Sequence, residues 1–185
     1  CDMFTYSQKF EHCLNSHDNF REVVDEYKPN ILFILARYVR LLTFPKTNVT
    51  LEAEGVVKET TARLLELSQN VKDHVFVFNA IPSPILNFQL IHANAIRGHK
   101  QIIPDMYLNS TIDMEHARER LAKSVSMCPK CSIIDYESVL TTNGTFQVYD
   151  NRTKVILMNK NWHFTPLGLH RLRPLYKSVC ENTGY

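Results

Sequence analysis

Two continuous apolar runs decide the fold, Ile31–Ala36 (ILFILA) and His74–Phe78 (HVFVF). Each has the length of a strand and lacks the polar alternation of a half-exposed strand. We therefore expect both to be buried on two faces, as the strands of a parallel sheet are. Shorter apolar runs at 132–135 and 155–158 predict two further strands.

The segments between these runs show the apolar spacing of helices. We expect helices over 8–28 with an interruption at 15–18, over 55–71, 85–96, 113–125 and 166–181, a short helix within 137–150, and a long polar connection over 37–54. Thr165 suits the N-cap of the last helix and Pro166 its first position. Strands that alternate with helices predict an α/β domain, a three-layer sandwich with a mostly parallel sheet, over residues 1–185.

In such sheets the ligand site lies beyond the carboxyl ends of the strands. The residues directly after the predicted strands are Arg37, Tyr38, Asn79–Ser83, Tyr136 and Asn159–His163. Arg37 and Asn79 could donate hydrogen bonds to a developing oxyanion or to substrate oxygens, or could be ordinary strand-end residues. His163 could act as a general base toward a hydroxyl nucleophile, or could merely pack against the last helix.

Composition excludes some classes of protein. The 185 residues are 44% hydrophobic and 22% charged, as in globular domains, and the net charge of +2 does not suit binding by phosphate neutralisation. No apolar run approaches the roughly 18 residues that span a bilayer. No glycine-rich phosphate loop is present, so no cofactor is expected. The chain begins with Cys1, and we expect it to be a processed or truncated product.

Sequons and cysteines suggest an oxidising, extracytoplasmic compartment. Candidate glycosylation sites are Asn48, Asn109, Asn143 and Asn151, and the disulfide candidates are Cys1, Cys13, Cys128, Cys131 and Cys180. The Cys128-x-x-Cys131 pair could be a zinc half-site, a redox pair or part of a structural disulfide, within the pair or to Cys13 or Cys180. No second ligand pair with supported geometry accompanies it, so we expect no metal.

The stretch His163–Gly168 (HFTPLG) resembles the last block of SGNH hydrolases. Its nearest variant is the SGNH domain fused behind the multi-span acyltransferase type 3 domain, which typically reads His-Leu-Thr-Pro-x-Gly. Three more stretches resemble the same variant: Pro29–Tyr38, His74–Pro82 and Cys128–Asp135. The resemblance implies a flavodoxin-like SGNH architecture that lacks its first strand, with a Ser–His–Asp site acting on acyl esters.

Two parts of the implied site are missing from the sequence. The chain has no Gly-Asp-Ser or Gly-Asn-Ser motif, and the resemblance places that motif upstream of Cys1. Lys160 stands where the family has its acid, and Lys cannot accept a hydrogen bond from an imidazole. Asn159 could orient the His163 ring without bringing charge. A Ser–His dyad and an inactive relative both remain open.

The resemblance implies a function for the parent protein. We expect a membrane O-acyltransferase that transfers acyl groups other than amino-acyl groups to hydroxyls of carbohydrate or lipid, with this domain on the extracellular or lumenal side, anchored through preceding transmembrane segments. The donor would arrive from the membrane domain, and the chain alone would be inactive. The alternative is a non-catalytic lumenal binding module with the same fold.

Overall fold

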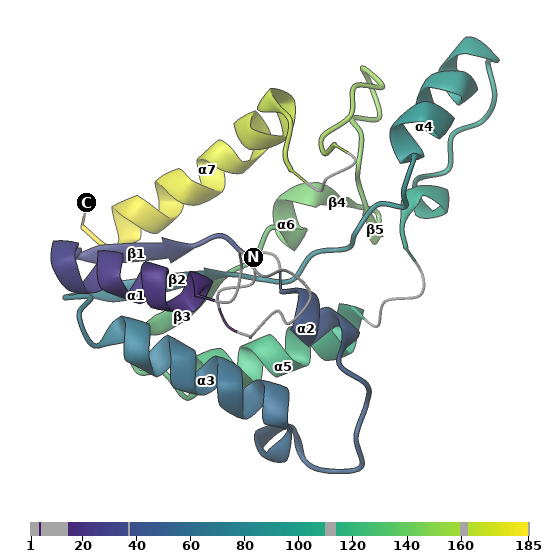
Figure 1. The fold of residues 1–185 in the computed structure, drawn as a ribbon. Coiled ribbons are helices and arrows are strands. Elements are labelled where there is room, and N and C mark those ends of the chain that lie inside the picture. The colour runs from purple at the N-terminus through teal and green to yellow at the C-terminus, as the bar shows by residue number, and fades with distance from the viewer. Residues whose placement is uncertain (1–3, 5–14, 37, 110–113, 160–162, 185) are drawn as a thin grey trace. The chain divides into compact units, whose positions relative to one another are not determined.

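The computed structural model describes residue 4 and residues 15–36, 38–109, 114–159 and 163–184 (Figure 1). The helices are α1 (Ser16–Tyr27), α2 (Val39–Thr43), α3 (Gly55–Ser68), α4 (Phe88–Arg97), α5 (Met114–Ser126), α6 (Glu137–Leu140) and α7 (Pro166–Asn182), with 3₁₀ turns η2 (Leu51–Ala53) and η3 (Pro104–Tyr107). The strands are β1 (Ile31–Ile34), β2 (His74–Phe78), β3 (Cys131–Ile134), β4 (Thr141–Thr142) and β5 (Thr145–Phe146). The chain packs into two compact units, Cys1–Ala80 with Ile112–Asp135, and Ile81–Thr111 with Tyr136–Tyr185.

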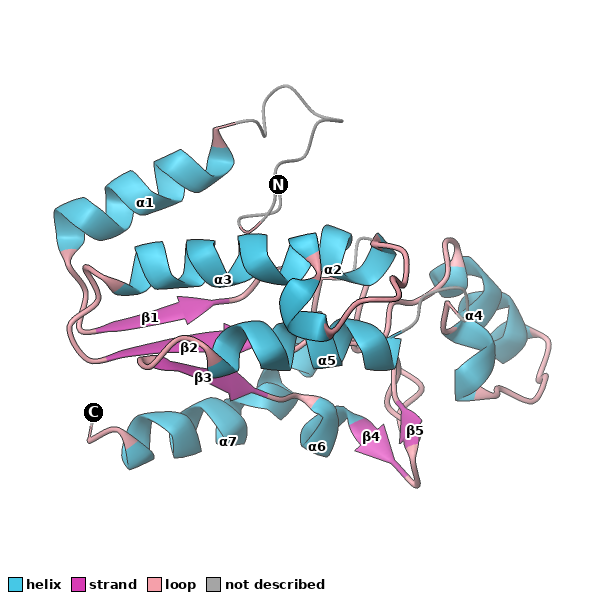
Figure 2. Ribbon diagram, turned by 90° about the horizontal axis from the view of Figure 1, so that it is seen from below, coloured by secondary structure: helices cyan, strands magenta, loops and turns pink. Residues whose placement is uncertain are grey.

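The first unit contains a parallel sheet in the order β1-β2-β3 (Figure 2). Central β2 is buried along most of its length, whereas β1 is half-buried over Ile31–Phe33. The α/β class and the parallel sheet are thereby confirmed. Because the three strands run the same way, their carboxyl ends lie at one edge.

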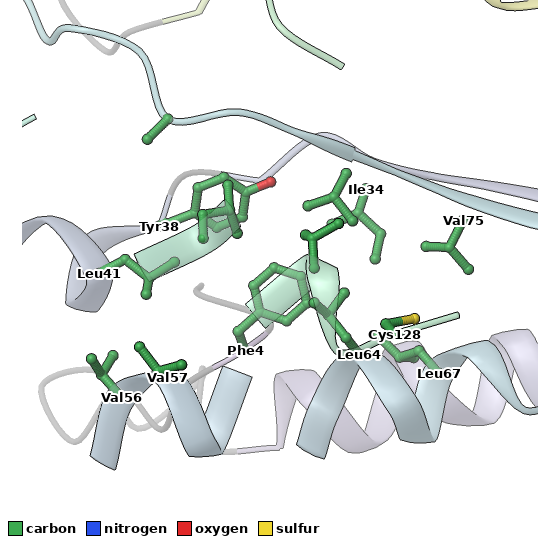
Figure 3. Packing of buried hydrophobic residues seen from close by; sticks show 14 of the residues in the cluster. Phe4, Ile34, Tyr38, Leu41, Val56, Val57, Leu64, Leu67, Val75 and Cys128 are labelled. Carbon is green, nitrogen blue, oxygen red and sulfur yellow. The ribbon is translucent and has the colours of Figure 1, made fainter. Parts of the chain in front are cut away.

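Side chains of α3 and α5 cover one face of this sheet. Val75 of β2 and Ile34 of β1 lie beside Leu64 and Leu67 of α3 (Figure 3), and all four are at most 2% exposed. Leu121 of α5 is fully buried in the same cluster. Each such side chain contributes about 1.5–3 kcal/mol by leaving water, so this core holds the strand ends in fixed register.

A buried ion pair joins α5 to the start of α3. Nε of Arg120 lies 2.6 Å from Oε2 of Glu54, and both side chains are 2% exposed. The other guanidinium nitrogens of Arg120 donate to the carbonyl oxygens of Leu41, Phe44 and Pro45 at 2.8–3.0 Å. Burial alone would raise the pKa of Glu54, but the hydrogen bond and charge of Arg120 hold it below its usual value. The pair therefore stays ionised inside the unit.

The second unit is organised around aromatic side chains. Phe88 and His92, one turn apart on α4, are both buried, and the His92 ring lies 5.5 Å from Tyr107 and 4.7 Å from Tyr149. Nε2 of His92 is 2.7 Å from the carbonyl oxygen of Lys154, so it carries a proton and donates. Burial raises the pKa of both tyrosines. The two phenol rings therefore remain neutral packing groups.

A short antiparallel hairpin, β4–β5, also belongs to the second unit. Asn143 and Gly144 form its turn with φ values of 51° and 77°. Positive φ at both central residues is typical of a type I′ turn, which suits the twist of a two-residue hairpin. Asn143 and Gly144 thus suit the tight turn that joins the two strands.

The predicted strand over 155–158 is wrong. This apolar segment makes isolated antiparallel bridges and joins no named strand among the described residues. The N–H of Leu157 donates to the carbonyl of Val148 at 2.8 Å, and its carbonyl accepts from the N–H of Thr165 at 2.9 Å. Neighbours close in sequence therefore satisfy the backbone groups that a parallel strand would have offered to the sheet.

Other boundaries also differ from the sequence predictions. The connection over 37–54 contains α2 and η2, and α1 begins at Ser16, within the interruption predicted at 15–18. The helix predicted from residue 85 begins at Phe88. The first part of the predicted helix over 8–28 lies outside the described residues.

Candidate active site

Three polar residues follow the three parallel strands where each strand ends. Tyr38 follows β1, Asn79 follows β2 and Asp135 follows β3, at the edge where the arrowheads of Figure 2 point. All three belong to the first unit. This edge is where parallel sheets place their ligand sites.

Tyr38 is a structural member of this edge. Its hydroxyl donates to the carbonyl oxygen of Phe78 at 2.5 Å, its ring stacks on Phe4 at 5.5 Å, and the side chain is 2% exposed. The hydrogen bond ties the end of β1 to the last residue of β2. Tyr38 therefore fixes the position of the chain just before Asn79.

Asn79 is buried, with 6% of its surface exposed, and its side chain is held at both ends. Oδ1 accepts from the N–H of Ala80 at 2.9 Å, and Nδ2 donates to Oδ2 of Asp135 at 2.7 Å. Its backbone N–H continues the ladder to the carbonyl of Ile134 at 2.9 Å. A carboxamide carries two N–H groups, so one donor of Asn79 is left for a further partner.

Asp135 and Arg118 complete this arrangement, and the sequence did not single them out. Arg118 of α5 donates from Nη1 to the carbonyl of Ala80 at 2.9 Å and forms an ion pair through Nη2 with Asp135. A closed ring of contacts thus runs through Asn79, Ala80, Arg118 and Asp135. The strand-end rule would have found Asp135 had β3 been predicted to end at Ile134, whereas Arg118 on a helix gives no sequence signal.

His163 lies in the second unit, in the segment before α7. The backbone N–H of Asn159 donates to the His163 carbonyl at 2.8 Å, and the N–H of His163 donates to Oδ1 of Asn159 at 3.1 Å. The side chain of His163 is exposed, and none of the described residues hydrogen-bonds to its imidazole. The Asn159 side-chain oxygen therefore holds the main chain of His163.

The start of α7 fixes the base of the His163 segment. Thr165 is the N-cap, with Oγ1 accepting from the N–H of Gly168 at 3.2 Å, and Pro166 is the first helical residue. The Thr165 hydroxyl also donates to the carbonyl of Ile156 at 2.8 Å. The predicted capping is confirmed, and it anchors the helix to the chain before His163.

A half-buried tyrosine of α7, Tyr176, belongs to the aromatic cluster beside this segment but cannot serve as its base. Tyr136 packs edge-on against both Phe164 and Tyr176, with ring centroids 5.6 Å and 5.9 Å away. Burial raises the pKa of Tyr176 to about 12, so its hydroxyl is neutral at physiological pH. These rings pack around the segment, and His163 remains its candidate base.

Two further residues of the predicted site, Arg37 and Lys160, lie outside the described residues. The predicted roles of Arg37, as an oxyanion donor, and of Lys160, in the place of the acid, therefore stay predictions. Asn79 belongs to one unit and His163 to the other. Their convergence on one substrate also stays a prediction.

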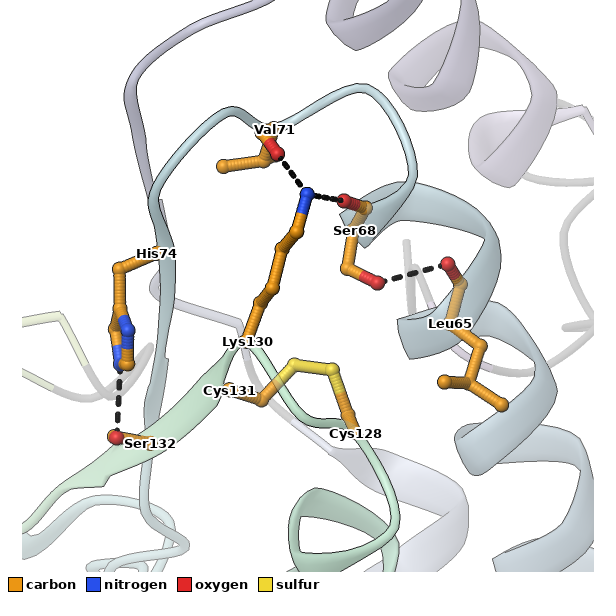
Figure 4. The surroundings of a disulfide bond; sticks show 8 residues. All are labelled: Leu65, Ser68, Val71, His74, Cys128, Lys130, Cys131 and Ser132. Atoms are coloured by element: carbon orange, nitrogen blue, oxygen red, sulfur yellow. Dashed lines mark hydrogen bonds between the residues drawn. A yellow bond between two sulfur atoms is a disulfide. The ribbon is translucent and has the colours of Figure 1, made fainter.

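Cys128 and Cys131 form a disulfide with their Cα atoms 5.3 Å apart (Figure 4). Between them, Lys130 donates from Nζ to the carbonyl of Val71 at 2.6 Å. The pair lies at the start of β3, at the opposite end of the sheet from Asn79. It fastens the turn before the strand, which fits the structural role among the three considered for it.

Cys180 on α7 is free and half-buried, whereas Cys1 and Cys13 lie outside the described residues. Within the described part of the chain, no group of three or more His, Cys, Asp or Glu side chains is arranged to hold a metal ion.

Comparison with protein families identifies the fold. The profile described as "SGNH domain (fused to AT3 domains)" matches residues 1–178. The chain belongs to this family. The match confirms the resemblance seen at His163–Gly168, and it makes the chain an SGNH domain of the type associated with acyltransferases. A search of curated proteins finds no match for the chain.

Proposed function

We propose that this SGNH domain is the extracytoplasmic part of a membrane O-acyltransferase that moves acyl groups, other than amino-acyl groups, onto hydroxyls of a carbohydrate or lipid. The family match over residues 1–178 carries the proposal, because it associates this domain with acyltransferase domains. The acyl donor would be delivered by the membrane domain.

His163 acts as the general base in this proposal. A serine from the part of the parent protein upstream of Cys1 gives its proton to His163 and attacks the acyl carbonyl, and His163 passes that proton to the departing donor group as the serine ester forms. The acceptor hydroxyl then gives its proton to the neutral His163 and attacks that ester, and His163 returns the proton to the serine oxygen as the serine leaves. The free N–H of Asn79 and the guanidinium of Arg37 stabilise the oxyanion in each step.

The exposed imidazole of His163 supports this role, since a base must be accessible to its substrate. The N-capped helix and the Asn159 contacts hold its backbone, as a positioned base requires. The ring of contacts around Asn79 likewise presets an amide donor before substrate binds.

Sequons support the extracytoplasmic location. Asn48, Asn143 and Asn151 are exposed and Asn109 is half-buried, so at least three could carry glycans on the folded protein. Among the described residues, no helix is both long enough and apolar enough to cross a membrane. The anchor in this proposal is the acyltransferase domain with which the family is associated.

The second candidate is a non-catalytic binding module, and one observation favours it. No carboxylate among the described residues contacts the His163 imidazole, and Lys160 stands where the family has its acid. A histidine without an acid partner loses orientation and charge stabilisation, although a Ser–His dyad can still operate. The module would bind the acceptor without transferring the acyl group.

The two candidates differ in whether a covalent intermediate forms. We would incubate the full-length parent protein with p-nitrophenyl acetate and search its peptides by mass spectrometry for an acetylated serine. The proposed function predicts acetylation of one serine upstream of Cys1, and its loss in His163→Ala. Absence of any acetylated serine in the wild-type protein, with its fold intact, would favour the binding module. The 185-residue chain alone should show no acetylation.

A further inference from the structure

We infer that Asp135 is a positioning residue, acting through Asn79, for the acyl transfer proposed above, and that Arg118 holds Asp135 in place. The inference rests on the proposed function and adds to it a role for two residues that the sequence did not single out. Its basis is the closed ring of contacts at the carboxyl edge of β2 and β3.

The geometry leaves Asn79 with one defined orientation. Oδ1 is occupied by the N–H of Ala80 and one N–H of Nδ2 by the Asp135 carboxylate, so rotation of the amide would break both bonds. The remaining N–H of this 6% exposed side chain therefore points in a direction that Asp135 determines. A donor fixed before substrate binds costs no reorganisation when negative charge develops on the acyl oxygen.

Arg118 keeps Asp135 in the orientation that this requires. One guanidinium nitrogen pairs with Oδ2, the same oxygen that accepts from Asn79, and another holds the carbonyl of Ala80. The side chains of Asp135 and Arg118 are 36% and 23% exposed, so this edge is reachable from solvent while Asn79 beneath it is buried. Packing alone would not require a carboxylate at position 135. The charge of Asp135 therefore fits a role in orienting Asn79.

A double-mutant cycle separates positioning from simple structural support. We would measure p-nitrophenyl acetate hydrolysis by the full-length parent protein carrying Asn79→Ala, Asp135→Asn or both. We expect Asn79→Ala to lower kcat about 100-fold. Asp135→Asn should lower kcat about 10-fold with KM little changed, as orienting groups of a second layer do. In the Asn79→Ala background, Asp135→Asn should have no further effect, because Asp135 acts through Asn79.

The matched control is Asp105→Asn, an exposed aspartate on η3, which should leave kcat unchanged. If Asp135→Asn lowers kcat by the same factor in the wild-type protein and in Asn79→Ala, the inference is overturned and the proposed function still stands. Full activity in both His163→Ala and Asn79→Ala, or no activity in the wild type, would instead remove the proposed function and the inference with it.

A second measurement covers the case in which Asn79→Ala does not fold. In the 185-residue chain, NMR should show one Nδ2 proton of Asn79 exchanging slowly with solvent because it is bonded to Asp135. In Asp135→Ala both protons should exchange fast. Two equally fast protons in the wild-type chain would contradict the inferred orientation.

Discussion

At the scale of single residues, Gly168 explains part of the His163–Gly168 motif. A Cβ built on Gly168 would lie 2.2 Å from the carbonyl oxygen of Leu157, which cannot move away because it accepts the N–H of Thr165. Only glycine fits at position 168, because the backbones of Gly168 and Leu157 approach each other too closely for a side chain. The motif sets the packing of α7 as well as the place of the histidine.

We predict that Gly168→Ala destabilises the protein, although alanine normally stabilises a helix by about 1 kcal/mol over glycine. The added methyl would push α7 away from Leu157. Urea unfolding followed by circular dichroism should show a lower midpoint for this variant. The control is Gly55→Ala at the start of α3, where no atom lies within 4 Å of the new Cβ. An unchanged or raised midpoint for Gly168→Ala would contradict the clash.

Residue chemistry also shows what the sequence could and could not predict about the site. The Thr165 cap and the strand-end position of Asn79 follow from local patterns, so both were predicted correctly. Arg118 was not, because its role depends on α5 packing beside β3, a tertiary contact without a sequence pattern. Asp135, the partner of Asn79, is not predicted because the expected strand over 132–135 includes it, whereas β3 ends one residue earlier at Ile134.

At the scale of elements, α3 is held from two sides by ionic groups. Glu54 at its start pairs with Arg120 of α5, and Glu66 near its end accepts from Arg21 and His17 of α1 at 2.8 Å and 2.9 Å. The first pair is buried and the second is partly exposed. We therefore expect very different costs when each is broken.

Glu54→Gln should lower the free energy of unfolding by about 3–5 kcal/mol, because it leaves the Arg120 charge buried without its partner. Chemical unfolding measures this directly. Glu52→Gln, which removes an exposed glutamate paired with Lys123, is the matched control and should change little. A similar loss in the free energy of unfolding for the two variants would contradict the cost expected from a buried, unpaired Arg120.

The contacts of Glu66 with Arg21 and His17 should make the stability of the protein depend on pH. The hydrogen bonds from Arg21 and then His17 lower the pKa of Glu66 from 4.5 to about 2. A lowered pKa in the folded state stabilises the fold above pH 4.5, and that contribution is lost as the pH falls toward 2. The unfolding temperatures of wild type and Glu66→Gln should therefore differ at neutral pH and converge near pH 2. A constant difference across this range would contradict the prediction.

Element prediction from sequence succeeded for the three apolar runs that form the parallel sheet and failed for the run over 155–158. β2 and α3 follow from an apolar run and from helical spacing. The segment 155–158 has the composition of a strand, yet its backbone bonds to Val148 and Thr165. Composition reports only that a segment is buried, and the choice between parallel pairing and isolated bridges depends on which chain lies alongside it.

At the scale of the whole molecule, each unit is built from two separate stretches of chain. Two of the three boundaries fall after Ala80 and after Asp135, directly behind the ends of β2 and β3, and the third falls after Thr111. No composition shift or linker marks them, so the sequence predicted one domain without internal division. The strand ends that carry Asn79 and Asp135 are thus also the points where the chain passes between units.

The proposed location of the molecule predicts glycans. Expression through a secretory pathway should yield a protein whose mass falls after treatment with peptide-N-glycosidase. Asn48→Gln and Asn143→Gln, at exposed sequons, should each remove one step of that shift. A mass unaffected by the enzyme would contradict the proposed extracytoplasmic location.

The most direct test of an acyl-transferring SGNH domain is the turnover of p-nitrophenyl acetate by the full-length parent protein and two histidine variants. His163→Ala should lower kcat about 1,000-fold, since a general base contributes on the order of 100- to 10,000-fold. His170→Ala, which changes an exposed histidine in the second turn of α7, should leave kcat unchanged. Equal activity in wild type and His163→Ala would contradict the central claim that His163 is the base of this domain.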